Sequence, residues 1–188
     1  VGSEMCIRDS MSTTDSSLVI GTLNGDRKAF GMLVDKYERR IFNLAFRICG
    51  DYEDAMDVTQ TVFVKAFERL ETFDPSRKFF SWLYRMGVNE SLNQVKRQSR
   101  IVHVEFDLPS RAPGPEQQLI REETDGLVQS ALRRLSEDHR VVIILRHFVD
   151  LSYSQISDVL AIPEKTVKSR LFSARQKMKE LLTEAGRL

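Results

Sequence analysis

Apolar residues recur every three or four positions over most of the chain, which is the spacing of amphipathic α-helices. The first long periodic segment follows Asp26, a typical helix-capping residue, and stops at Gly50. Its apolar positions are Phe30, Leu33, Val34, Tyr37, Ile41, Leu44, Ala45 and Ile48. A shorter apolar segment, Leu18 to Leu23, comes before it. The pattern therefore predicts one short and one long helix.

Two more long helices are predicted further along the chain. From Asp51 to Leu70, apolar residues occupy one side of a helix and most of the acids occupy the other. The sequence Phe73-Asp74-Pro75-Ser76 is typical of a turn, and helical periodicity resumes from about Arg77 to Arg100. Packed together, these helices predict a first helical domain over residues 15–101.

Residues 102–117 break the periodicity. They hold three of the five prolines, and residues 101–126 contain six acids against two bases, which predicts an acidic linker. Helical patterns resume over Glu116 to Leu135 and Glu137 to Phe148, and predict a second domain over residues 118–188. No segment predicts a β-sheet. The expected fold class is therefore all-α, with two small helical domains joined by a flexible linker.

The second domain ends in a recognisable motif. Ser152 to Lys177 predicts two short helices joined by a tight turn, the layout of a helix-turn-helix DNA-binding motif. Pro163 suits the first position of the second helix, since its missing N–H would be unpaired there. Apolar residues at helical spacing predict that the two helices pack together: Ile156, Val159, Leu160, Val167, Leu171 and Ala174. The alternative is an ordinary helical hairpin with a solvated basic face.

Composition narrows the class of protein. With 41% hydrophobic and 29% charged residues the 188-residue chain is typical of a globular protein, and no apolar run approaches the roughly 20 residues that span a bilayer. Two cysteines give no disulfide framework, and no signal peptide is apparent, so we expect a cytoplasmic protein without membrane insertion. Residues 1–14 are expected to be a disordered tail, with the first ten of foreign origin because Met11 resembles a natural start.

Charge is unevenly distributed along the chain. The net charge of +1 is low for a nucleic-acid-binding protein. However, residues 50–74 hold seven acids against two bases, while residues 163–188 hold seven bases against three acids. We therefore expect different parts of the chain to contact different partners.

The predicted helix from Arg77 to Arg100 mixes aromatic and basic residues. Such a surface can hold single-stranded DNA, because bases stack on aromatic rings while cations contact the backbone. Alternatively, most of these aromatics fill the core, which we expect for Trp82, Leu83 and one of the two phenylalanines, Phe79 and Phe80.

Nothing in the sequence predicts catalysis. The three histidines lack metal-ligand spacing, and neither a glycine-rich phosphate loop nor a nucleophile motif is present. We therefore expect no enzyme activity, no metal and no cofactor.

Several motifs together resemble the bacterial RNA polymerase sigma factors of the extracytoplasmic-function class, which contain conserved regions 2 and 4. Asp54 to Phe63 (DAMDVTQTVF) is similar to region 2.2, and Phe79 to Arg85 (FFSWLYR) with Asn89 is similar to regions 2.3 and 2.4. The segments similar to region 4 are Leu135-Ser136, Arg140, Leu145-Arg146, Leu151-Ser152-Tyr153, Ile156, Leu160-Ala161-Ile162, Thr166 to Leu171 and Ala174-Arg175.

The resemblance implies three binding surfaces. Contact with core RNA polymerase is implied for Asp54, Asp57, Val58, Gln60, Thr61 and Phe63. Contact with the promoter −10 element is implied for Arg77, Lys78, Phe80, Tyr84, Arg85, Asn89, Asn93, Lys96, Arg97 and Arg100. Contact with the −35 element is implied for Lys165, Thr166, Lys168, Ser169, Arg170, Phe172, Ser173, Arg175 and Lys177.

The implied function is that of a bacterial sigma factor, which binds core polymerase and directs promoter recognition, DNA melting and initiation at a subset of promoters. An anti-sigma factor is an implied further partner. Two other classes remain open at this point: a regulator that binds DNA without polymerase, as a dimer on a palindrome, and a helical interaction protein that never contacts DNA.

Overall fold

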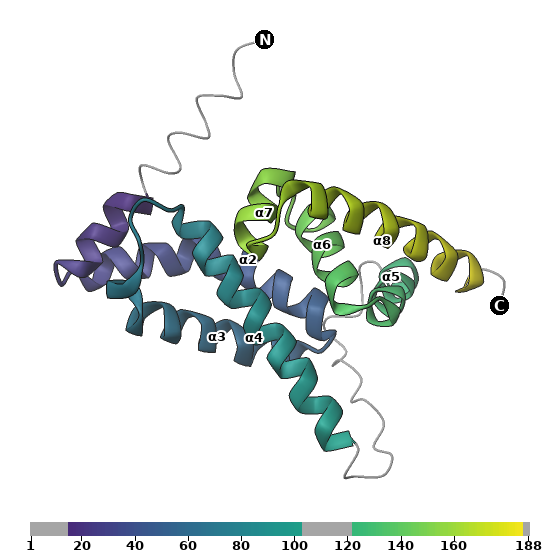
Figure 1. Ribbon diagram of the computed structural model, residues 1–188. Coiled ribbons are helices and arrows are strands. Elements are labelled where there is room, and N and C mark those ends of the chain that lie inside the picture. The colour runs from purple at the N-terminus through teal and green to yellow at the C-terminus, as the bar shows by residue number, and fades with distance from the viewer. Residues whose placement is uncertain (1–14, 103–121, 186–188) are drawn as a thin grey trace.

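The computed structural model describes residues 15–102 and 122–185 (Figure 1). Within these two ranges every regular element is helical, so the predicted all-α fold class is confirmed. The elements are a helix over residues 15–23, α2 (Arg27–Cys49), α3 (Tyr52–Glu68), the 3-10 turn η1 (Leu70–Thr72), α4 (Phe79–Val102), α5 (Glu122–Arg134), α6 (Glu137–His147), α7 (Tyr153–Leu160) and α8 (Glu164–Ala185).

Local signals in the sequence set the ends of α2. Asp26 caps its start by accepting hydrogen bonds from the amides of Lys28 (2.9 Å) and Ala29 (3.4 Å). Gly50 ends it in the left-handed conformation, with φ 76°, which costs glycine little. The predicted boundaries of this helix are therefore confirmed.

Helices α2, α3 and α4 form the N-terminal half of the molecule, residues 15–102. Their facing sides supply fully buried side chains such as Leu33, Ile41 and Leu83, each worth about 1.5–3 kcal/mol of burial free energy. At Gly87 the helices α4 and α2 come so close that an added Cβ would lie 3.0 Å from Leu44 Cδ2. The short helix 15–23 is held on α2 by the Tyr37 hydroxyl, which donates to Asp15 at 2.5 Å.

Helices α5 to α8 form the C-terminal half, residues 122–185. Ile156 and Val159 of α7 pack against Val167 and Leu171 of α8, and all four are buried as the periodicity predicted. The tight turn between these helices passes through Ala161 in the left-handed conformation, with φ 53°. The predicted helix-turn-helix is therefore present.

Two predicted boundaries were displaced. The helix expected to begin at Arg77 begins at Phe79, because the Asp74 side chain accepts from the Ser76 amide and the Asp74 carbonyl accepts from the Arg77 amide, which prolongs the turn. Pro163 precedes α8 instead of opening it, and its carbonyl accepts from Thr166 N at 2.8 Å.

Several other expectations fall partly or wholly outside the described residues. They are the N-terminal tail 1–14, most of the linker 102–117, and the start of the helix expected from Glu116.

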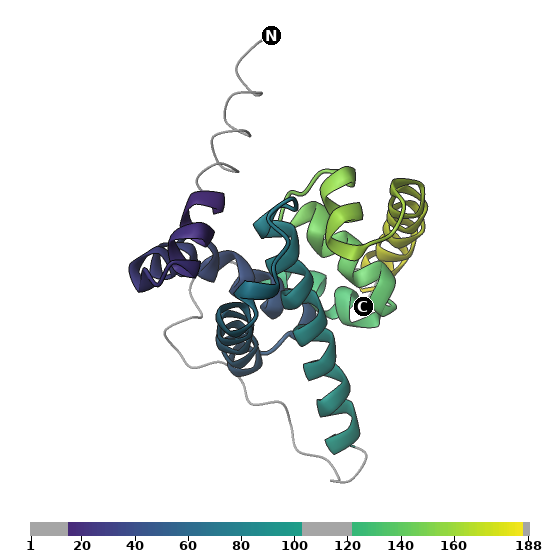
Figure 2. The ribbon, with the colours of Figure 1, turned by 60° about the vertical axis from the view of Figure 1, so that its left-hand side comes forward.

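The two halves lie against each other and share one continuous buried core. Helix α7 packs on α4, and α5 and α6 pack near the end of α2 (Figures 1 and 2). The sequence predicted two domains but not this contact between them.

Candidate polymerase and nucleic-acid interfaces

The outer face of α8 presents a row of polar, basic and aromatic side chains. Phe172 is 66% exposed, which is unusual for so large an apolar side chain. Most of the residues predicted to reach the −35 element are also exposed, with two half-buried; in chain order the set is Lys165, Thr166, Lys168, Ser169, Arg170, Phe172, Ser173, Arg175 and Lys177. The structure therefore gathers this predicted set on one helix.

Some of these cations have partners within the C-terminal half. Arg170 pairs with Asp138 of α6 at 2.8 Å, and Lys177 pairs with Glu180 at 3.0 Å. The Lys168 ammonium lies 6.0 Å from the centre of the Tyr153 ring, over its face. These contacts hold the basic side chains close to α8 and to the helices behind it.

The placement of α8 depends on α7, which has only eight residues. Ser152 and Gln155 form a reciprocal capping box at its start, because the Ser152 hydroxyl accepts from the Gln155 amide and the Gln155 side chain accepts from the Ser152 amide. At the far end the Ser157 hydroxyl donates to the Ile162 carbonyl at 2.6 Å and closes the turn. Local polar contacts thus orient the recognition helix.

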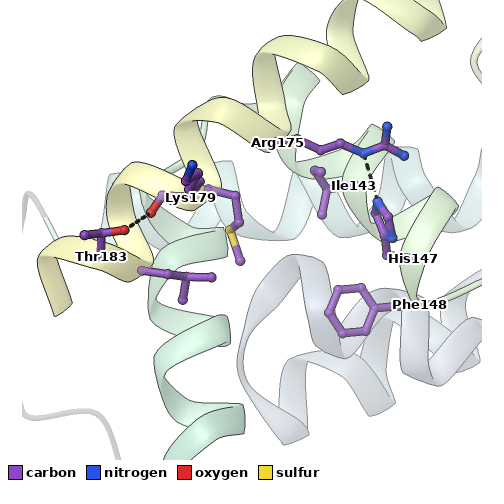
Figure 3. A pocket seen from close by; sticks show the side chains of 8 residues that line it. Ile143, His147, Phe148, Arg175, Lys179 and Thr183 are labelled. Carbon is purple, nitrogen blue, oxygen red and sulfur yellow. Dashed lines mark hydrogen bonds between the residues drawn. The ribbon is translucent and has the colours of Figure 1, made fainter. Parts of the chain in front are cut away.

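A groove of about 540 Å³ lies between α6 and the second half of α8 (Figure 3). Ile143, Phe148 and Met178 give it an apolar lining, and the Arg175 guanidinium donates to His147 Nε2 at 3.3 Å along its rim. Burial, and then the positive charges of Arg175 and Arg146, lower the pKa of His147. The sequence reasoning missed this groove, although Met178 and Leu182 at i and i+4 extend the apolar stripe of α8 beyond the helix-turn-helix.

The acidic helix α3 presents a mixed polar and apolar face. Asp57 and Gln60 are exposed and Thr61 is half-buried, so these three predicted residues are available to a partner. The same helix has three exposed apolar residues on either side of them that were not predicted from the sequence: Met56 (43% exposed), Val64 (56%) and Phe67 (49%). Their helical spacing from Asp57 and Gln60 could have placed them on this face from the sequence alone. An exposed face of this kind is typical of an interaction surface.

The other three residues predicted for polymerase contact are buried. Val58 and Phe63 pack in the core, with 4% and 8% of their surface exposed. Asp54, also 8% exposed, accepts hydrogen bonds from Gln94 at 2.8 Å and from Gln98. In this conformation Asp54 therefore fixes α3 to α4 and does not face solvent.

The residues predicted to reach the −10 element are divided by burial. Arg77, Lys78, Asn89, Asn93, Lys96 and Arg97 are exposed, Phe80 and Arg85 are half-buried, and Tyr84 is 2% exposed. The side chain of Arg100 lies outside the described residues. Burial raises the pKa of Tyr84 to about 12, so its hydroxyl stays protonated at neutral pH. Of the two phenylalanines, Phe79 is in the core, in agreement with expectation. Trp82 was also expected in the core but is only half-buried.

Phe80 and Tyr84 line a hollow of about 410 Å³ at the start of α4. Arg77 and Lys78 give it a basic side, and Arg40 of α2 lines it as well. Asp15 and Tyr37 line it from the N-terminal half, and Val149, Leu151 and Gln155 form a wall from the C-terminal half.

The exposed face of α4 also contacts the C-terminal half directly. Arg85 donates to the backbone carbonyls of Val159 (3.0 Å) and Asp158 (2.6 Å), at the end of α7. Lys96 pairs with Glu137 of α6 at 3.0 Å. Two residues predicted to contact DNA thus have protein partners here.

Residues 15–102 and 122–185 form neither a metal site nor a membrane-spanning helix. No group of three or more His, Cys, Asp or Glu side chains there could hold a metal ion. Over the same ranges, no helix has the length and apolar content to cross a membrane.

Comparison with known proteins identifies the family. The family model for Sigma-70 region 2 matches residues 33–101, and the model for Sigma-70 region 4 matches residues 125–178. An ECF RNA polymerase sigma-E factor is also 34% identical to the chain over 87% of its length, so the chain belongs to the extracytoplasmic-function sigma factors. The two matches fall within the predicted domains 15–101 and 118–188, in the order that the resemblance implied.

Relatives in several bacteria resemble this sigma factor over nearly their whole length. The RNA polymerase sigma-H factor of Pseudomonas aeruginosa is 34% identical over 180 residues, which cover 89% of this chain and 93% of the relative. The ECF RNA polymerase sigma-E factor of Escherichia coli K12 is 34% identical over 175 residues, covering 87% and 91%. SigW of Bacillus subtilis is 28% identical over 172 residues, covering 85% and 92%.

Two solved structures resemble the sigma factor in fold. CnrH, solved in complex with the cytosolic domain of CnrY, matches with a TM-score of 0.72 and 28% identity over 91% of this chain and 98% of CnrH. The sigma factor RpoE of Bartonella quintana, solved in complex with the anti-sigma factor NepR, matches with a TM-score of 0.68 and 26% identity over 83% and 98%.

Proposed function

We propose that this sigma factor binds core RNA polymerase and directs promoter recognition, DNA melting and transcription initiation at a subset of promoters. The observation that carries the proposal is the occurrence of regions 2 and 4 in order on one chain. Each region carries an exposed surface suited to its partner. A free-standing repressor would not need the acidic and apolar face of α3, and a simple helical interaction protein would not need the basic face of α8.

Helix α3 is the proposed contact with core polymerase. Asp57, Gln60 and Thr61 stand at i, i+3 and i+4, so a carboxylate, an amide and a hydroxyl can bond a basic partner helix side by side. The exposed apolar residues of the same face would add buried area to the contact. Asp54, Val58 and Phe63 support this surface from behind by fixing α3 in the core.

The start and outer face of α4 are the proposed contact with the −10 element. Base stacking on an aromatic ring contributes about 1–3 kcal/mol, and Phe80 and Tyr84 line a hollow that could accept a base. The role of Tyr84 requires some opening of that hollow, because its side chain is buried. The exposed polar and basic residues of the loop before α4 and of α4 would hold the DNA backbone: Arg77, Lys78, Asn89, Asn93, Lys96 and Arg97.

Helix α8 is the proposed contact with the −35 element. Lys168, Ser169 and Phe172 lie on its exposed face, where they can reach base edges in a major groove. Arg170 and Lys177 already have acidic partners in the protein, so a phosphate contact from either side chain would have to replace that ion pair. The low net charge of +1 suggests weak binding to promoter DNA without polymerase.

An anti-sigma factor is a further proposed partner. Support comes from RpoE, a structural neighbour that was solved in complex with the anti-sigma factor NepR. The proposed site of action is the bacterial cytoplasm, where polymerase and promoters are found. The proposed role is non-catalytic, since a sigma factor guides the chemistry of the polymerase.

The proposal predicts stable association with polymerase. Purified protein mixed with bacterial core polymerase should co-elute with it on size-exclusion chromatography, while a matched sample without polymerase should elute as a small protein. Tight, polymerase-independent binding to a palindromic DNA site, with no co-elution, would instead support a free-standing regulator.

A further inference from the structure

A hydrogen bond joins the side chains of Arg175 in α8 and His147 at the end of α6. The Arg175 Nε–H donates to His147 Nε2 at 3.3 Å, along the rim of the groove in Figure 3. A guanidinium has donors but no acceptor, so Nε2 must accept and carry no proton. This contact therefore requires the neutral imidazole, with its proton on Nδ1.

The charged groups beside this pair come mainly from α8 and α6. Arg175 and Lys179 of α8 line the groove together with His147, and Arg146 precedes His147 in α6. Asp150 pairs with Arg146 at 3.8 Å, but its side chain is 93% exposed, so it offsets little of this positive charge. His147 therefore lies among cations.

A further cation comes from α2. The Arg47 guanidinium lies over the ring of Phe148, the residue after His147, at 4.5 Å from the ring centre. Burial, followed by the positive charges of Arg175 and Arg146, lowers the pKa of His147. In the free protein a protonated imidazole would lose the hydrogen bond from Arg175 and lie among like charges. A nearby anion would reverse this preference, because opposite charge favours the protonated form.

DNA bound to α8 would supply such an anion. Arg175 and Lys168 belong to the proposed −35 surface, are both exposed, and lie two turns apart on one side of α8. Phosphates that approach these cations would also stabilise positive charge on His147. Once His147 is protonated, its Nε2 cannot accept, so the Arg175 guanidinium is released and the imidazolium adds one positive charge.

We infer that His147 is a positioning residue for Arg175, and that its protonation releases Arg175 to a DNA phosphate and tightens the binding of DNA to α8 at acidic pH. The inference deepens the proposed function, because it rests on the −35 surface of α8 and concerns how that surface is regulated. His147 lies outside the predicted −35 set and acts through Arg175.

Three variants test the roles of hydrogen bonding and charge. His147→Gln keeps an acceptor for Arg175 but does not titrate. His147→Lys has no acceptor and is positively charged throughout the test. His139→Gln is the matched control, because His139 is the other described histidine beside α8 and lines a separate groove with Phe172. Circular dichroism would check that each variant keeps its helices.

Fluorescence anisotropy would measure binding of the full-length proteins to a labelled DNA duplex at about pH 7.5 and about pH 5.5, on either side of the ordinary histidine range. Phosphate contacts are independent of sequence, so an arbitrary duplex of about 20 base pairs is a suitable probe. Each measurement would be repeated over a range of salt concentrations.

We expect wild type and His139→Gln to bind about five- to tenfold more tightly at the lower pH, as follows from a roughly tenfold higher proton affinity of His147 on DNA. The slope of log K against log salt should steepen by about 0.9, the value for one added phosphate contact. His147→Gln should show neither change. His147→Lys should bind tightly, with the steeper slope, at both pH values.

NMR titration of the histidine ring protons would test the pair without DNA, with His147→Gln identifying the His147 signals. Arg175→Ala should raise the pKa of His147, because it removes a neighbouring positive charge. A pKa of His147 that is unchanged by Arg175→Ala would overturn the inference. The same holds for DNA binding that weakens at acidic pH, that is equally pH-dependent in His147→Gln, or that is absent at both pH values.

Failure of the proposed function has a different signature. In that case the protein would not support transcription when mixed with core polymerase at any pH. The dependence of duplex binding on His147 and Arg175 would still be measurable.

Discussion

Ala161 adopts a left-handed backbone conformation, with φ 53°, in the turn of the helix-turn-helix. A residue with a Cβ pays roughly 1–2 kcal/mol there, a cost that glycine avoids. Because glycine also makes the unfolded chain more flexible, we expect Ala161→Gly to raise the free energy of unfolding by only about 0.5–1 kcal/mol. Urea unfolding followed by circular dichroism would measure it. A decrease would show that the turn needs the alanine side chain.

Cys49 is a second residue whose environment makes a clear prediction. Burial, followed by the charges of Asp54 and Asp51, raises the pKa of its thiol to about 12. The folded protein therefore keeps the proton while the unfolded chain loses it from about pH 8.5 upwards, so this group lowers the stability of the fold as pH rises towards 12. At pH 8 iodoacetamide should modify Cys49 far more slowly in native than in urea-unfolded protein. Equal rates, measured by mass spectrometry, would contradict this.

At the scale of helices, the predictions from the sequence were most accurate where capping residues and apolar spacing determine the structure. Asp26 and Gly50 set the ends of α2, and the spacing of Ile156, Val159 and Val167 predicted the helix-turn-helix. The burial of individual side chains on α4 was harder to predict, because aromatic residues lie on several sides of its first two turns. Phe79 and Tyr84 are buried while Phe80 is half-buried, and no period in the sequence separates them.

Helix α3 carries the prediction about polymerase. Asp57→Ala with Gln60→Ala should weaken core binding by about tenfold or more, since hydrogen bonds to charged groups contribute roughly 1.5–3 kcal/mol. Thermal unfolding should hardly change, because both side chains are exposed. Titration of labelled protein with core polymerase would measure the effect. Asp35→Asn with Glu38→Gln on the exposed face of α2 is the control, and an equal loss there would refute the assignment to α3.

Helix α8 carries the prediction about promoter choice. Lys168→Ala with Phe172→Ala should reduce initiation at promoters that depend on a −35 element, because each good base contact discriminates by about 1–3 kcal/mol. Core binding should survive. Lys179→Ala, further along the same helix, is the matched control. If the α8 variant lost core binding and the α3 variant lost −35 dependence, the two assignments would be reversed.

At the scale of the whole molecule, the contact between the halves is what the sequence could not predict. The donors Arg85, Arg133 and Arg140 bond to backbone carbonyls, and a carbonyl is present at every position, so no residue type or spacing marks the partner. Asp54, Val58 and Phe63 are buried, although the resemblance implied that they contact polymerase. The motif around Asp54 holds the fold together as well as forming a surface.

The proposed function requires the whole molecule, because neither half should direct initiation alone. Transcription in vitro with core polymerase, this protein and fragmented genomic DNA, followed by mapping of RNA 5′ ends, tests it most directly. We predict start sites at a limited set of positions that share −35 and −10 sequences and are absent without the protein. Start sites unchanged by the addition of well-folded protein would contradict the account.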